Sequence, residues 1–139
     1  MFYFSYHSRP CLRPGSLEEQ DLIAQARIAN GVCDITGFLY REGDLLLQYL
    51  EGPRAELIEL RNRISVDSRH NAVVILGQGL TSRRFFTGWP LGFCTAAVGT
   101  FGRFLGDAWG KTSLTEATAQ DARLFLDGMC QRFDLGLAS

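Results

Sequence analysis

The chain has 139 residues, of which 46% are hydrophobic and 21% charged, and its formal net charge is -1 at pH 7. This length suits one domain with a substantial core. The balanced charge gives no reason to expect nucleic acid or an anionic membrane surface as a partner. No apolar run approaches the roughly 20 residues that a membrane-spanning helix needs.

The N-terminal sequence and the cysteines indicate the cellular compartment of the protein. The first ten residues, MFYFSYHSRP, lack the basic-then-apolar order of a signal peptide. Four scattered cysteines, without a C-x-x-C pair, predict free thiols and no metal site. We therefore expect a cytoplasmic protein.

Strand and helix patterns alternate along the first two thirds of the chain. β-rich or alternating segments predict strands, and a capping box from Ser16 to Glu19 predicts the start of the first helix. The expected elements are strands at about 2–7, 34–41, 44–51 and 72–80, a fifth strand starting near Trp89, and helices at about 17–30 and 53–66.

This order predicts an α+β fold of the ferredoxin-like βαββαβ type, with an extra fifth strand and two helices on one sheet face. We assign residues 1–98 to this domain and residues 99–139 to a linker and a C-terminal helical cap. The glycine-rich stretch 99–110 is expected to be a connector. The cap helix, about 113–133, would cover the other sheet face or form a dimer.

Gln48 is unexpected in its strand, LLLQYLEG. It lies on the same face as Leu46 and Leu50, and a buried amide without a partner costs roughly 1–3 kcal/mol. The first and third strands of a βαββαβ sheet are neighbours, so Tyr6 can meet Gln48 under the helices. A phenol and an amide satisfy each other. The residues alone leave open whether this pair stabilises the core or forms the polar edge of a ligand site.

Further polar residues gather where the two helices end. Each one singly fits a helix cap or a charged turn. Together they predict a cleft between the helices, with apolar walls that include Ile35 and with polar groups at its rim, which suits a flat heteroaromatic ligand. No carboxylate pair or nucleophile–base pair is evident, so we do not expect an enzyme. The polar set is Arg27, Asn30, Asp67, Arg69 and His70.

Five short motifs in this order and spacing resemble the BLUF family, blue-light sensors that use flavin. The resemblance covers about residues 1–96 and implies a flavin between the two helices, with FAD usual and FMN not excluded. The motifs are Y-x-S at 6–8, Asn30 followed by I-T-G at 35–37, LLQYLEG with Gln48, D-x-R-H at 67–70, and R-x-F-x-x-W from Arg84 to Trp89.

The resemblance also implies roles for single residues. Tyr6 would donate an electron and a proton to the photoexcited flavin, and Gln48 would lie between Tyr6 and the flavin N5/C4=O edge. Asn30 would hold the C4=O/N3 side, and Arg69 would reach the C2=O side with Asp67 and His70 nearby. Arg27 matches a basic position often seen before the asparagine.

The chain departs from the family at Trp89-Pro90-Leu91, where W-S-M is common. Leu91 has no sulfur to accept a hydrogen bond, and Pro90 removes a strand donor. We expect flavin binding to survive both changes, while the output step, to which Trp89 and Leu91 belong, is in question. We expect the sensor to signal to a separate, unidentified protein, and a homo-oligomer is open.

Two other functions stay open. An acylphosphatase-like enzyme would use Arg27 and Asn30, although no phosphate-cradling loop is evident. A ferredoxin-like regulatory or dimerisation module without photoactivity would keep the fold and lack the ligand, and the departures at Pro90 and Leu91 keep this alternative open.

Overall fold

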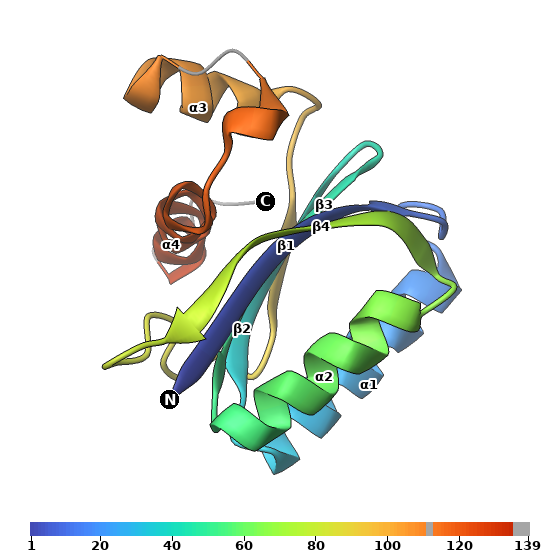
Figure 1. Ribbon diagram of the computed structural model, residues 1–139. Coiled ribbons are helices and arrows are strands. Elements are labelled where there is room, and N and C mark those ends of the chain that lie inside the picture. The colour runs from blue at the N-terminus through green and yellow to red at the C-terminus, as the bar shows by residue number, and fades with distance from the viewer. Residues whose placement is uncertain (111–112, 135–139) are drawn as a thin grey trace.

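The computed structural model describes residues 1–110 and 113–134 (Figure 1). Strands and helices follow each other as expected up to the fourth strand. The elements are β1 (Phe2–Pro10), α1 (Leu17–Val32), β2 (Thr36–Glu42), β3 (Leu45–Gly52), α2 (Arg54–Val66), β4 (His70–Leu80), β5 (Gly92–Thr95), α3 (Thr100–Trp109), the short 3-10 helix η1 (Leu114–Glu116) and α4 (Ala119–Asp134).

The five strands form one mixed sheet in the order β4-β1-β3-β2-β5. β1 pairs antiparallel with β3 and with β4, β2 pairs antiparallel with β3, and β5 runs parallel to β2. Helices α1 and α2 cover one face of the sheet, and α4 lies against the other (Figure 1). The expected ferredoxin-like α+β fold with an extra strand is confirmed.

Local chemistry fixes where these elements begin and turn. The Ser16 side chain accepts from the Glu19 N–H, as the predicted capping box requires. The Glu19 carboxylate accepts from the N–H of Gly15, at 2.9 Å, and not from that of Ser16. Gly43 turns the β2–β3 hairpin with a φ of +52°. A Cβ at Gly37 would lie 2.3 Å from the Tyr49 carbonyl oxygen, so this crossing requires glycine.

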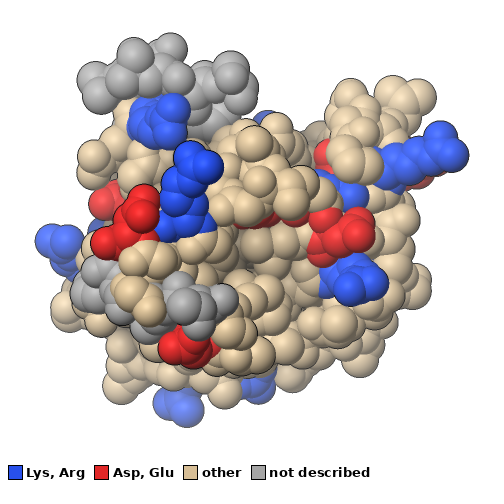
Figure 2. All heavy atoms as spheres, turned by 90° about the horizontal axis from the view of Figure 1, so that it is seen from above, with Lys and Arg blue, Asp and Glu red and all other residues tan. Residues whose placement is uncertain are grey.

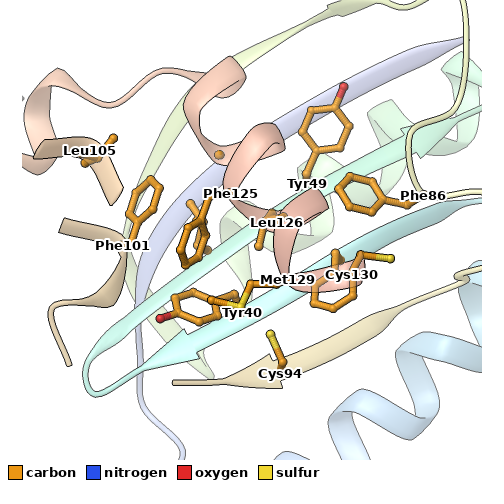
Figure 3. Packing of buried hydrophobic residues seen from close by; sticks show 13 residues of the cluster. Tyr40, Tyr49, Phe86, Cys94, Phe101, Leu105, Phe125, Leu126, Met129 and Cys130 are labelled. Carbon is orange, nitrogen blue, oxygen red and sulfur yellow. The ribbon is translucent and has the colours of Figure 1, made fainter. Parts of the chain in front are cut away.

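The face covered by α4 is an aromatic core (Figure 3). Tyr40 from β2 meets Phe125 from α4 edge to face, with ring centroids 4.8 Å apart. Phe101 from α3 lies 5.0 Å from the same Phe125 ring. The cap is therefore held by buried aromatic packing to the central strands as well as by its chain connection.

Three boundaries differ from the prediction. Residues 100–109, predicted as a connector, form helix α3, because the Glu42 carboxylate accepts from the Gly99 and Phe101 N–H groups at 2.5 and 2.7 Å. The cap helix begins at Ala119 and not at 113, with Thr118 and Asp121 capping each other. β5 begins at Gly92 and not near Trp89, since Pro90 has no N–H to donate.

Charged side chains of both signs are interspersed on the face seen from above (Figure 2), as expected for a net charge of -1. Within residues 1–110 and 113–134, no helix has the length and apolar composition needed to cross a membrane.

Candidate functional site

A cavity of about 290 Å³ lies between α1, α2 and the sheet. Its floor includes Tyr6 from β1, Gln48 from β3 and Leu39 from β2, and its sides are mostly apolar residues of the two helices. Six of the seven residues predicted to bind a cofactor line this one cavity, namely Asn30, Ile35, Gln48, Asp67, Arg69 and His70.

The Tyr6 and Gln48 side chains meet on the cavity floor. The two residues are directly opposite in the β1–β3 register, and the Tyr6 hydroxyl donates to Gln48 Oε1. Both side chains are buried, and Ser5 holds the Gln48 main-chain carbonyl at 2.7 Å. Because Oε1 faces Tyr6, the amide Nε2 lies on the side of the carboxamide away from the phenol. Gln48 is thus held at one end and has donor capacity at the other.

Burial keeps the Tyr6 phenol protonated. Desolvation raises the pKa of Tyr6 well above its usual value, and the nearby Asp67 charge raises it further. The proton in the Tyr6–Gln48 hydrogen bond therefore stays on the Tyr6 oxygen as long as Tyr6 is not oxidised.

His70 is fixed on both ring nitrogens. Its Nε2 lies 2.6 Å from the Ile64 carbonyl oxygen, and its Nδ1 lies 2.8 Å from Ser8 Oγ. A carbonyl only accepts, so Nε2 carries a hydrogen, and in the neutral ring Nδ1 accepts from Ser8. The imidazole stands edge-on to the Tyr6 ring, with centroids 5.9 Å apart. This wall of the cavity is a rigid polar support for Tyr6.

The turn after α2 carries an ion pair at the cavity rim. Arg69 binds the Asp67 carboxylate through Nη2 at 2.6 Å and through Nε at 2.9 Å. Hydrogen bonds from Arg69 lower the pKa of Asp67 to about 2. The Arg69 side chain remains partly exposed, so its remaining N–H groups are accessible to a ligand.

Asn30 and Arg27 lie one turn apart on α1 but differ in their surroundings. Asn30 is buried, lines the cavity and donates from Nδ2 to the Pro90 carbonyl at 2.8 Å. Arg27 does not line the cavity. Its Nε donates to the Leu91 carbonyl at 2.9 Å, and it borders a neighbouring hollow of about 620 Å³.

Trp89 and Leu91 point to opposite faces of the sheet. Leu91 is 2% exposed and lines the cavity. Trp89 packs with the aromatic core on the α4 side, its ring centroid 5.7 Å from that of Phe38. Of the two residues predicted for the output step, Leu91 is therefore the one at the cavity.

A comparison with known proteins gives the family of the chain. The family model described as "BLUF: Sensors of blue-light using FAD" matches residues 1–92. The chain belongs to the BLUF family. It is therefore a flavin-binding blue-light photoreceptor, and the predicted resemblance is confirmed. No curated protein in the comparison matches the chain.

Solved BLUF structures share the fold of this chain. "BlsA photo-activated state" is 22% identical, covers 91% of this chain and 92% of its own, and has a TM-score of 0.75. "BlrB - a BLUF protein, dark state structure" is also 22% identical, with 93% of each chain covered and a TM-score of 0.71. Klebsiella pneumoniae BlrP1 with FMN and cyclic diGMP is 28% identical over 68% of this chain but 25% of its own, with a TM-score of 0.61.

The cavity fits the ring system of a flavin. Its volume is at the small end of the range for ligand sites, it has apolar walls, and the Gln48 amide and the buried Asn30 amide face it. A flavin bound here supplies a chromophore that becomes a strong oxidant in blue light. FAD and FMN share this ring system, so the fit of the cavity to the ring does not distinguish FAD from FMN.

A buried ion pair at the cavity was not predicted from the sequence. Arg41 Nη1 lies 2.5 Å from Glu19 Oε2, and the two side chains are 4% and 7% exposed. Both border the cavity. Alternation along β2 places Arg41 on the face of Leu39, so the available signal was an arginine at a core-facing position. Within the described residues, no group of three His, Cys, Asp or Glu side chains could hold a metal ion.

The remaining BLUF motif residues form a separate structural site on the α4 side. The fully buried Glu51 carboxylate accepts from the Phe85 and Phe86 N–H groups, both at 2.8 Å, and from Thr36 Oγ1 at 3.0 Å. Arg84 adds a hydrogen bond to Thr36 at 3.0 Å. Glu51 and the R-x-F-x-x-W motif thus fasten the segment that leads to β5 and do not line the cavity.

Proposed function

We propose that this BLUF protein senses light through an exchange of hydrogen bonds at Gln48, with Tyr6 as the electron and proton donor. The observation that carries the proposal is the hydrogen bond from Tyr6 to Gln48 on the floor of the cavity. FAD as the chromophore is part of the proposal and rests on the description of the family model.

The positions of the side chains support a separate role for each cavity residue. Asn30 has a second N–H besides the one given to Pro90, and this second donor suits a flavin carbonyl. Arg69 at the rim suits the other carbonyl edge, with Asp67 orienting its guanidinium. His70 holds the ring of Tyr6 in place, and Ile35 adds apolar wall.

The exchange itself uses groups that are already in contact. Removal of an electron from Tyr6 makes its hydroxyl strongly acidic, and the proton moves along the existing hydrogen bond to Gln48 Oε1. When the electron and the proton return to Tyr6, the Gln48 side chain is left turned or as the other tautomer. Because a buried amide must stay bonded, the lit state exchanges one set of Gln48 partners for another.

We propose that the response leaves the cavity through Leu91 and reaches a separate protein. Leu91 lines the cavity and continues directly into β5, whose Phe93 also lines the cavity and whose Cys94 belongs to the core on the α4 side. The solved relatives include a light-regulated adenylyl cyclase of which this chain covers 35%. Free thiols at all four cysteines support a cytoplasmic location.

A dark and a lit absorption spectrum of the purified protein test this function. The wild type loaded with FAD should absorb in the flavin blue bands and shift to the red under blue light. Tyr6→Phe and Gln48→Leu should keep the flavin and lose the shift. Tyr3→Phe is the matched control, because Tyr3 stacks on Tyr49 at 5.3 Å on the other sheet face. A normal photocycle in either cavity variant contradicts the assigned roles.

The same preparation separates the other functions. A protein that takes up no added flavin would support the regulatory module without photoactivity. Hydrolysis of an acyl phosphate would support the enzyme, although Arg27 and Asn30 both donate to main-chain carbonyls. Chromatography of the flavin released from protein expressed in cells decides between FAD and FMN.

A further inference from the structure

The segment before β5 is fixed through three consecutive carbonyl groups. The Trp89 carbonyl accepts from the Gly37 N–H at 2.9 Å. The Pro90 carbonyl accepts from Asn30 Nδ2 at 2.8 Å, and the Leu91 carbonyl accepts from Arg27 Nε at 2.9 Å. Two of the three donors are thus side chains of α1 and not partners in the sheet.

The sequence explains why side chains take this role. Pro90 has no N–H, and the ladder between β2 and β5 begins only where Phe38 pairs with Gly92. The carbonyls of Pro90 and Leu91 precede this ladder, and their donors are side chains of α1. Asn30 and Arg27 are three residues apart on α1, which places both side chains on one face of that helix, toward this segment.

Arg27 and the Leu91 side chain lie on different sides of the Leu91 main chain. The Leu91 side chain is buried in the wall of the flavin cavity. Arg27 is largely exposed and borders the neighbouring hollow, together with Phe93 and Thr95. Arg27 thus contacts the cavity wall at the Leu91 main chain, and the hollow that it borders shares Phe93 with the cavity.

We propose that Arg27 is a positioning residue for Leu91 in the photocycle and does not bind the flavin. This proposal rests on the proposed function of Gln48. Leu91 and Gln48 line the same cavity, and a closely packed wall raises the barrier for a side chain that must turn inside it. Without Arg27 the Leu91 main chain loses its donor, the wall loosens, and the lit state returns to the dark state faster.

Arg27→Met tests the proposal, since methionine keeps much of the apolar stem and removes the donor. Flavin affinity of the apoprotein, measured by fluorescence quenching, should stay within about twofold of the wild type. Dark recovery of the red-shifted spectrum should become about threefold to tenfold faster. Arg27→Lys, which retains a donor, should recover at a rate between those of Arg27→Met and the wild type.

Arg54→Met is the matched control, because Arg54 is an exposed residue of α2 that borders neither hollow. It should leave affinity and recovery unchanged. A tenfold loss of flavin affinity in Arg27→Met overturns the proposal in favour of a ligand role, and an unchanged recovery rate overturns it as well.

A readout in the dark separates this proposal from the proposed function. Hydrogen exchange of the peptide containing residues 88–95 should be faster in Arg27→Met than in the wild type, with or without a photocycle. A wild type without a light-induced shift refutes the proposed function, and unchanged exchange in this peptide then refutes the role of Arg27 independently.

Discussion

Buried polar side chains on the two faces of the sheet differ in their hydrogen-bond partners. On the α4 face, the Glu51 and Glu42 carboxylates accept main-chain N–H groups of the segments before and after β5. On the α1–α2 face, Gln48 and Asn30 are bonded at one side and face a cavity with the other. The two carboxylates on the first face fix the chain, whereas the two amides on the second are left available to a ligand.

The BLUF motifs therefore include residues of two kinds, those that line the cavity and those that fasten the chain. Y-x-S, Asn30 and D-x-R-H supply cavity residues, whereas Glu51 and Arg84 fasten the strand through which we expect the response to leave. Substitutions on the α4 face should therefore affect stability first. Substitutions on the cavity face should affect the light response first.

Glu51→Ala should have the largest effect, a loss of about 3 kcal/mol or more in the free energy of unfolding. It leaves the Phe85 and Phe86 N–H groups buried without an acceptor, at roughly 1–3 kcal/mol each. Urea unfolding of the apoprotein measures this loss. Glu59→Ala, on an exposed position of α2, is the control and should be near wild type. A stable Glu51→Ala protein would contradict the structural role of this face.

Gln48→Leu should cost less, about 1–2 kcal/mol, because it leaves the Tyr6 hydroxyl without its acceptor. Adding Tyr6→Phe should restore most of that stability, since both polar groups are then gone. Urea unfolding of the two single variants and the double variant measures this coupling. Additive losses would mean that the two side chains are not energetically coupled and would contradict the hydrogen bond between them.

Leu91→Met should change the free energy of unfolding by less than about 1 kcal/mol, because the two side chains have similar volumes. It restores the sulfur that this chain lacks on the cavity wall. Flavin content and the red shift should both be retained. Loss of flavin from this variant would show that the cavity depends on the shape of leucine.

Asp67→Asn should give the smallest effect, visible only in its pH dependence. The pKa of Asp67 is about 2 in the folded chain against an ordinary value of 3.8. The ionised carboxylate therefore stabilises the fold above about pH 4, and this contribution is lost as the pH falls toward 2. The difference in unfolding free energy between wild type and variant should shrink from about pH 6 to about pH 2. A difference in unfolding free energy that does not change with pH would show that the ionised Asp67 carboxylate does not stabilise the fold.

Period-2 alternation and strand order were sufficient to predict the meeting of Tyr6 and Gln48, because each strand residue has a fixed face. The position of Asn30 at the end of the first helix predicted that it lies at the same cavity, together with Ile35. The family resemblance assigned Arg27 to the cofactor, and helix position alone does not tell which neighbour a long side chain reaches. Glycine-rich 99–110 was taken for a connector, since propensity does not include the Glu42 carboxylate that completes the start of α3.

The contact between Glu42 and the start of α3 also orders the events of folding. Glu42 and Phe101 are 59 residues apart in the chain, and a helix as short as α3 is marginal in isolation. We expect the β2–β3 hairpin to form first and α3 to become stable only afterwards. During synthesis the C-terminal cap would then assemble last, and amide protection in α3 would report that the rest of the domain is complete.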